Sequence, residues 1–115
     1  MIDLAKIENI YLVPGYTDMR KQVDGLLSVL VTEYPHIEIE PNNLYIFCGR
    51  DRTKIKVLEI DPYGVWVYYK RTHGDKFLWP RNKDASLIDK RQLLWLLEGL
   101  SVVQKHAHKE QYYTY

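Results

Sequence analysis

Hydrophobic and polar positions alternate with a period of two in the middle of the chain. Between residues 44 and 71, three runs rich in aromatic and β-branched residues are separated by two compact polar turns. This pattern predicts an antiparallel meander with strands at about 44–48, 54–60 and 65–71. A short fourth strand is expected near 76–79. The apolar run from Ile10 to Val13, which Pro14 and Gly15 end, is a further candidate strand.

The parity of the side chains defines two faces in these strands. In the third strand, Val65, Val67 and Tyr69 point one way, and the residues between them point the other way. In the second strand, the apolar parity changes after Val57, because Leu58 and Ile60 are both apolar. Either a β-bulge or a strand buried on both faces towards its end explains the change.

A helical period of apolar residues flanks the meander on both sides. Before it, Thr17 fits a helix N-cap with Asp18 in the first turn, and Pro35 ends the helix. Its apolar stripe consists of Val23, Leu26, Leu27 and Leu30.

The second predicted helix follows the meander. Asp89 and Gln92 form a capping box, and Gly99 is placed as the C′ residue. Its apolar stripe consists of Leu93, Leu96, Leu97 and Leu100. We expect Leu26, Leu30 and Leu97 to be core residues.

These elements predict a single α+β domain over residues 1–100. It is an antiparallel β-meander of three to five strands, with two amphipathic helices covering its apolar face. The length of 115 residues is enough for one domain with a substantial core. Residues 101–115 lose the apolar periodicity and are expected to form a frayed C-terminal tail.

The positive charge of the chain is local. The formal net charge is only +1, but residues 50–83 hold nine Lys or Arg and four Asp or Glu. Cations alternate with apolar residues in the meander, so a basic, aromatic-rich sheet face and a polyanion partner are predicted. The candidate nucleic-acid-binding residues are Arg50, Arg52, Lys54, Lys56, Trp66, Tyr68, Lys70 and Arg71, together with Arg20 and Lys21 at the start of the first helix.

Two interpretations of these residues stay open. In the first, the cations follow phosphates while Trp66 and Tyr68 stack on bases. In the second, they form an ordinary solvated sheet face whose lysines prevent edge pairing. For Lys21, an ion pair with Asp24 is the favoured explanation of its placement near a helix N-terminus.

The sequence does not favour catalysis, a metal site or a cofactor. Asp18, Asp24, Asp51 and Asp61 could form the carboxylate set of a nuclease, but each also fits a local role in a turn, a helix start or an ion pair. The single cysteine, Cys48, excludes an intrachain disulfide. With no apolar segment long enough for a bilayer, the chain is expected to be cytoplasmic.

Four segments together resemble the TnpB, or Orf2-like, family of accessory proteins of IS66-type insertion sequences. They read PGYTDMRKQVDGL (14–26), LYIFCGRDRTKIKVLEIDPYGVWVYYKR (44–71), FLWP (77–80) and QLLWLLEGL (92–100). In the family, a Cys-Asn pair tends to precede several arginines, whereas this chain has Gly49 after Cys48 and fewer cations in the loop.

The resemblance implies a non-catalytic accessory protein for DNA transposition. The implied partners are DNA, the transposase of the same element and a second small accessory protein. Two alternatives remain from the residues: a protein–protein assembly factor without nucleic-acid affinity, and a small metal-dependent nuclease.

Overall fold

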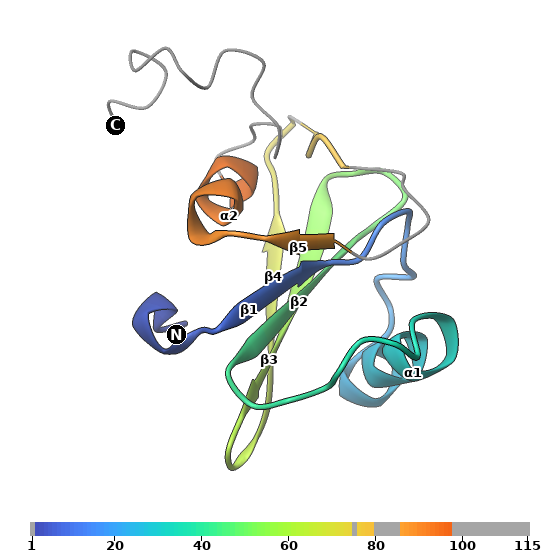
Figure 1. Ribbon diagram of the computed structural model, residues 1–115. Helices are drawn as coiled ribbons and strands as arrows, with labels where there is room; N and C mark the ends of the chain where they lie inside the picture. Colours follow the sequence, from blue (N-terminus) through green and yellow to red (C-terminus); the bar gives the residue numbers. More distant parts are fainter. Residues whose placement is uncertain (1, 75, 80–85, 98–115) are drawn as a thin grey trace.

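The computed structural model describes residues 2–74, 76–79 and 86–97 (Figure 1). Its elements in chain order are η1 (Leu4–Lys6), β1 (Asn9–Leu12), α1 (Val23–Glu33), β2 (Asn43–Cys48), β3 (Lys54–Asp61), β4 (Gly64–Arg71), β5 (Ser86–Ile88) and α2 (Lys90–Leu97). The five strands form one sheet in the order β4-β3-β2-β1-β5. None of the described helices is long and apolar enough to cross a membrane.

The sheet is mixed, because β1 runs parallel to β2. The other neighbours, β2–β3, β3–β4 and β1–β5, are antiparallel. The α+β class and the meander of β2, β3 and β4 are therefore confirmed, whereas the wholly antiparallel sheet is wrong. The physical reason is the long connection through α1, which carries the chain back to the end of the sheet where β1 began.

The β2–β3–β4 meander has a continuous register without a bulge. Val57 pairs with both Ile46 and Tyr68, and the pairing of β3 with β4 proceeds without a skip from Lys54 to Asp61. Val57 and Leu58 are buried against opposite faces of the sheet. The change of apolar parity in β3 therefore reflects burial on both faces.

The two helices cover opposite faces of the sheet (Figure 1). Leu26, Val29 and Leu30 of α1 pack with one group of buried sheet residues, Tyr45, Phe47 and Leu58. Leu93 and Leu96 of α2 pack with the other group, Ile10, Leu12, Leu44, Ile46, Ile55 and Val57. The expectation that both helices share one apolar face is therefore wrong, since every residue of β2 is buried and each face needs its own cover.

The first helix begins later than the sequence predicts. Asp18 starts a separate turn, because its Oδ1 accepts a hydrogen bond from the backbone N–H of Arg20 at 2.9 Å. This local bond competes with helix formation. Thr17 is not an N-cap: it is buried, and its N–H donates to the carbonyl oxygen of Cys48 at 2.8 Å. Residues 18–21 thus form a turn, and α1 starts at Val23.

The capping box of the second helix is confirmed. The backbone N–H of Gln92 donates to Asp89 Oδ1 at 2.7 Å, and the N–H of Asp89 donates to Gln92 Oε1 at 3.0 Å. Of the predicted core leucines, Leu26 and Leu30 are buried, and Leu97 is half-buried. The predicted Gly99, Leu100 and tail lie outside the described residues.

The expected strand at 76–79 is absent from the described part of that segment, which contributes core side chains instead. Phe77 and Trp79 are both buried. The N–H of Phe77 donates to Arg52 O at 2.7 Å, and the indole N–H of Trp79 donates to Val13 O at 2.9 Å. The strand that completes the sheet is β5, which the sequence pattern did not identify because it has only three residues.

Replacing Leu96 by Ala is expected to lower the free energy of unfolding by about 2–5 kcal/mol, because it leaves a cavity between α2 and the sheet. The matched control is Leu94→Ala on the same helix, where the side chain is 47% exposed and the expected loss is below about 0.5 kcal/mol. Chemical denaturation measures both values. Equal losses for the two variants would show that α2 does not pack through Leu96.

Candidate nucleic-acid interface

The register of the β3–β4 hairpin divides the predicted basic face between the two sides of the sheet. Lys54 pairs with Arg71, and Lys56 pairs with Tyr69, so these four side chains share the side covered by α1. Trp66, Tyr68 and Lys70 have the opposite parity and lie on the α2 side. The prediction that the lysines and these two aromatic rings share one face is therefore wrong.

The three residues on the α2 side have local partners. The Lys70 ammonium donates to the carbonyl oxygen of Leu97 at 2.8 Å, at the C-terminal end of α2 where a cation is favourable. The Trp66 indole N–H donates to Asp61 Oδ2 at 2.8 Å, and the Tyr68 hydroxyl donates to Glu59 Oε1 at 2.6 Å. These contacts stabilise the hairpin and fasten α2 to it.

The acid–base properties of these groups agree with that structural role. Burial, followed by the hydrogen bond to Glu59, raises the pKa of Tyr68 to about 12. The pKa of Asp61 is lowered, first by the backbone N–H of Tyr63 and then by the Trp66 indole. At neutral pH, Tyr68 is therefore a hydrogen-bond donor and Asp61 an ionised acceptor.

On the α1 side, three segments that are distant in sequence meet. The turn 18–21 is attached to β3 by the Lys56 ammonium, which donates to Lys21 O at 2.7 Å. The loop 49–53 closes on β3 through Gly49 N and Lys54 O at 2.9 Å. Met19 packs so closely on Gly49 that an added Cβ would lie 2.7 Å from its Cγ. We call the cations of this region the cationic corner: Arg20, Lys21, Arg50, Arg52, Lys54, Lys56 and Arg71.

Two carboxylates accompany these seven cations. Asp18 binds the Arg20 guanidinium at 2.8 Å, and this hydrogen bond is the largest cause of its strongly lowered pKa. Asp51 Oδ2 lies 3.3 Å from Lys54 Nζ, and the backbone N–H of Thr53 is the largest cause of its lowered pKa. Both ion pairs are solvent-exposed, so they are weak and leave an excess of positive charge. The expected Lys21–Asp24 ion pair does not form.

The loop of the cationic corner has a defined backbone. Arg52 adopts a left-handed conformation with φ of 61°, its N–H donates to Gly49 O at 3.0 Å, and its carbonyl accepts from Phe77. Arg52 is half-buried, whereas Arg50 at the tip is exposed. Arg52 therefore shapes the loop, and Arg50 extends into solvent.

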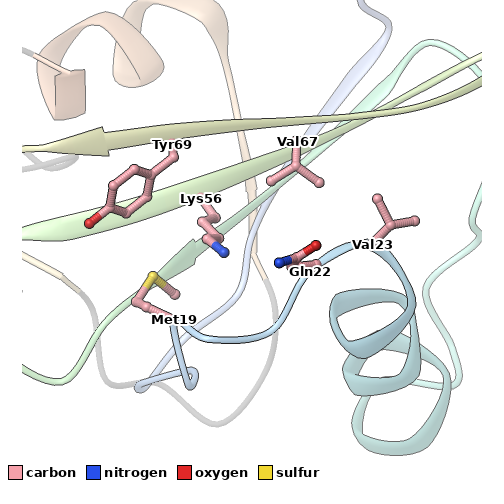
Figure 2. Close-up of a pocket in the computed structure, with 6 residues that line it drawn as sticks. All are labelled: Met19, Gln22, Val23, Lys56, Val67 and Tyr69. Atoms are coloured by element: carbon pink, nitrogen blue, oxygen red, sulfur yellow. The ribbon is translucent and has the colours of Figure 1, made fainter.

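A groove of about 460 Å³ opens beside the corner, between the turn 18–21, the start of α1 and β3–β4. Figure 2 shows its lining residues, Met19, Gln22, Val23, Lys56, Val67 and Tyr69. The Lys56 ammonium lies 5.8 Å from the centre of the Tyr69 ring. Tyr69 was not among the predicted site residues. The turn at Asp61–Gly64 is the signal that identifies it. When residues are paired outwards from this turn, Tyr69 lies opposite Lys56.

The described residues contain no group of three or more His, Cys, Asp or Glu side chains that could hold a metal ion. Three of the four aspartates that could form a nuclease site have local structural roles. Asp18, Asp51 and Asp61 each accept a hydrogen bond from a backbone N–H in a turn.

The sequence model of the family described as "IS66 Orf2 like protein" matches residues 8–107, and the chain therefore belongs to this family of insertion-sequence accessory proteins. The resemblance that the sequence motifs indicated is thus confirmed. A similar curated protein is the "Uncharacterized protein y4hO" of Sinorhizobium fredii (strain NBRC 101917 / NGR234), 30% identical over 101 residues, which are 87% of each chain. No solved structure matches the chain.

The thiol of Cys48, at the end of β2 beside the loop, is expected to be unreactive in the folded protein. Burial, with a smaller contribution from the Asp51 carboxylate, raises its pKa to about 12. The thiol therefore stays protonated at pH 8, while an unfolded cysteine with a pKa of about 8.5 is partly ionised. A colorimetric thiol reagent should modify Cys48 only after denaturant is added. Rapid labelling of the native protein would show that this end of β2 is open.

Proposed function

We propose that the protein is a non-catalytic accessory protein for transposition, which binds DNA through the cationic corner. The observation that carries the proposal is that two basic segments, the turn 18–21 and the loop 49–53, are hydrogen-bonded to β3 beside Lys54, Lys56 and Arg71. Membership of the insertion-sequence family supports DNA as the polyanion.

The corner suits contact with the phosphate backbone. Lys21, Arg50 and Arg71 are exposed, and Lys54 lies directly across from Arg71 on the neighbouring strand. Cations on a rigid sheet and two fastened turns can follow successive phosphates and release counterions from the DNA. Such contacts fix register and orientation without reading sequence. We therefore propose binding that depends on salt and only weakly on the DNA sequence.

The proposed protein partners are the transposase and the second small accessory protein of the same element, as family membership suggests. In this proposal, the α2 side of the hairpin does not contact DNA, because Lys70 is the one candidate cation of the hairpin on that side, whereas Lys54, Lys56 and Arg71 share the α1 side. It is the side on which protein contacts are expected. A pure assembly factor without nucleic-acid affinity is the alternative, and the salt dependence of DNA binding separates the two.

Replacing Lys54 and Arg71 together by Ala is expected to weaken duplex binding and to flatten its salt dependence. Each lost phosphate contact lowers the slope of log K against log salt by about 0.9, so the pair should lower it by about 1.8. The matched control replaces Lys90 and Arg91, an equal loss of one Lys and one Arg at the start of α2. Fluorescence anisotropy over a salt series measures both slopes.

The control variant should keep the slope of the unmodified protein. An equal change in both variants would mean that DNA binding depends only on the net charge of the protein. The cationic corner would then not be the DNA-binding surface. Absence of salt-dependent binding by the unmodified protein would favour the assembly factor.

The non-catalytic part of the proposal predicts that the protein leaves supercoiled plasmid intact with Mg²⁺ or Mn²⁺ present. A nuclease site needs several carboxylates that converge on divalent ions. Gel electrophoresis of the plasmid is the measurement. A reproducible nicking activity that disappears on Asp18→Asn, Asp24→Asn or Asp61→Asn would contradict it, because a contaminant cannot respond to a mutation in this chain.

A further inference from the structure

We infer that the groove beside the cationic corner receives one unpaired nucleotide of a DNA strand, with the base in the groove and its flanking phosphates on the corner. The inference rests on the proposed DNA binding and adds the structural feature of the DNA that the protein selects. It implies a preference for DNA with a base outside the helical stack, such as a bulge.

The volume and the lining residues of the groove fit a nucleobase. Its volume of about 460 Å³ falls within the range of small-molecule sites. Met19, Val23 and Val67 form apolar walls (Figure 2). Tyr69, whose exposed fraction is 54%, adds an aromatic ring as a stacking surface. Base–aromatic stacking tolerates every base, because each has a π-face.

The polar groups in the groove fit the edge of a base and its phosphate. The Gln22 amide is exposed and offers both a donor and an acceptor. The Lys56 ammonium uses one of its three donors on Lys21 O, which leaves two for a phosphate at the mouth of the groove. The same ammonium lies over the Tyr69 ring, 5.8 Å from its centre, so positive charge forms part of the aromatic wall of the groove.

The start of α1 adds a favourable electrostatic field. Val23 is the first helical residue, and the N-cap residue, Gln22, makes no capping hydrogen bond with its side chain. The first N–H groups of a helix carry a partial positive charge that favours an anion nearby. The groove therefore combines an apolar interior, an aromatic ring and two sources of positive charge.

A base within a regular duplex cannot use this site. Its two faces are covered by neighbouring base pairs, and only its edges are accessible in the grooves. A base that has left the stack exposes both faces, and it can enter the space between Tyr69 and the turn 18–21. The geometry thus favours distorted DNA over perfectly paired DNA of the same charge.

The test compares a short blunt duplex with the same duplex carrying a one-nucleotide bulge, by fluorescence anisotropy at fixed salt. The unmodified protein should bind the bulged DNA about tenfold more tightly, the scale of one base–aromatic stack. Tyr69→Ala should remove this preference, and Tyr69→Phe should retain it. The matched control is Trp66→Ala, since Trp66 is also 54% exposed on β4 but lies on the other side. This control should keep the preference.

A second measurement needs no variant. A 2-aminopurine base at the bulge should lose fluorescence when saturating protein stacks it on Tyr69, whereas the same base within the paired region should change little. Equal binding of both DNAs, or unchanged emission at the bulge, overturns the inference while the proposed function stands. Loss of the preference in Trp66→Ala but not in Tyr69→Ala overturns it as well. Failure to bind either DNA overturns the proposed function itself.

Discussion

Burial of β2 on both faces is the constraint on which the rest of the structure depends. All six residues from Asn43 to Cys48 are buried, so each face of the sheet must be covered by apolar side chains from elsewhere. The chain meets this requirement with α1 on one face and α2, Phe77 and Trp79 on the other. The outer strand β4 is separated from β2 by β3, and none of its residues is fully buried.

The position of α1 determines which cations meet. Because the turn 18–21 precedes α1 instead of belonging to it, the backbone of Lys21 lies against β3. Lys56 fastens this turn to β3 through Lys21 O and at the same time contacts the Tyr69 ring. One side chain thus positions the turn, shapes the groove and contributes charge. The same side of the hairpin therefore holds the cations that we propose as phosphate ligands and the aromatic ring that we propose as a stacking surface.

Much of the local structure could be predicted from the sequence, because it rests on contacts between near neighbours. The Asp89–Gln92 capping box, the meander and the parity of β4 all follow from short-range patterns. The parallel pairing of β1 with β2 and the short strand β5 could not, since long-range packing selects them. The continuous apolar run in β2 was a signal of two-sided burial. A strand buried on both faces requires a helix on each side of the sheet, which is the observed arrangement.

The sequence indicates which residues are candidates for the site, but not which side of the sheet each side chain occupies. Arg50, Lys54 and Arg71 lie at the cationic corner, whereas Trp66, Tyr68 and Lys70 are on the other side, because successive side chains of a strand point to opposite faces.

DNA binding at the cationic corner is tested most directly by mapping amide chemical-shift changes on the isotope-labelled protein during titration with duplex DNA. Binding at the cationic corner predicts changes concentrated at residues 19–22, 49–56 and 69–71. Changes concentrated instead at α2 and Trp66, with the corner unaffected, would contradict it.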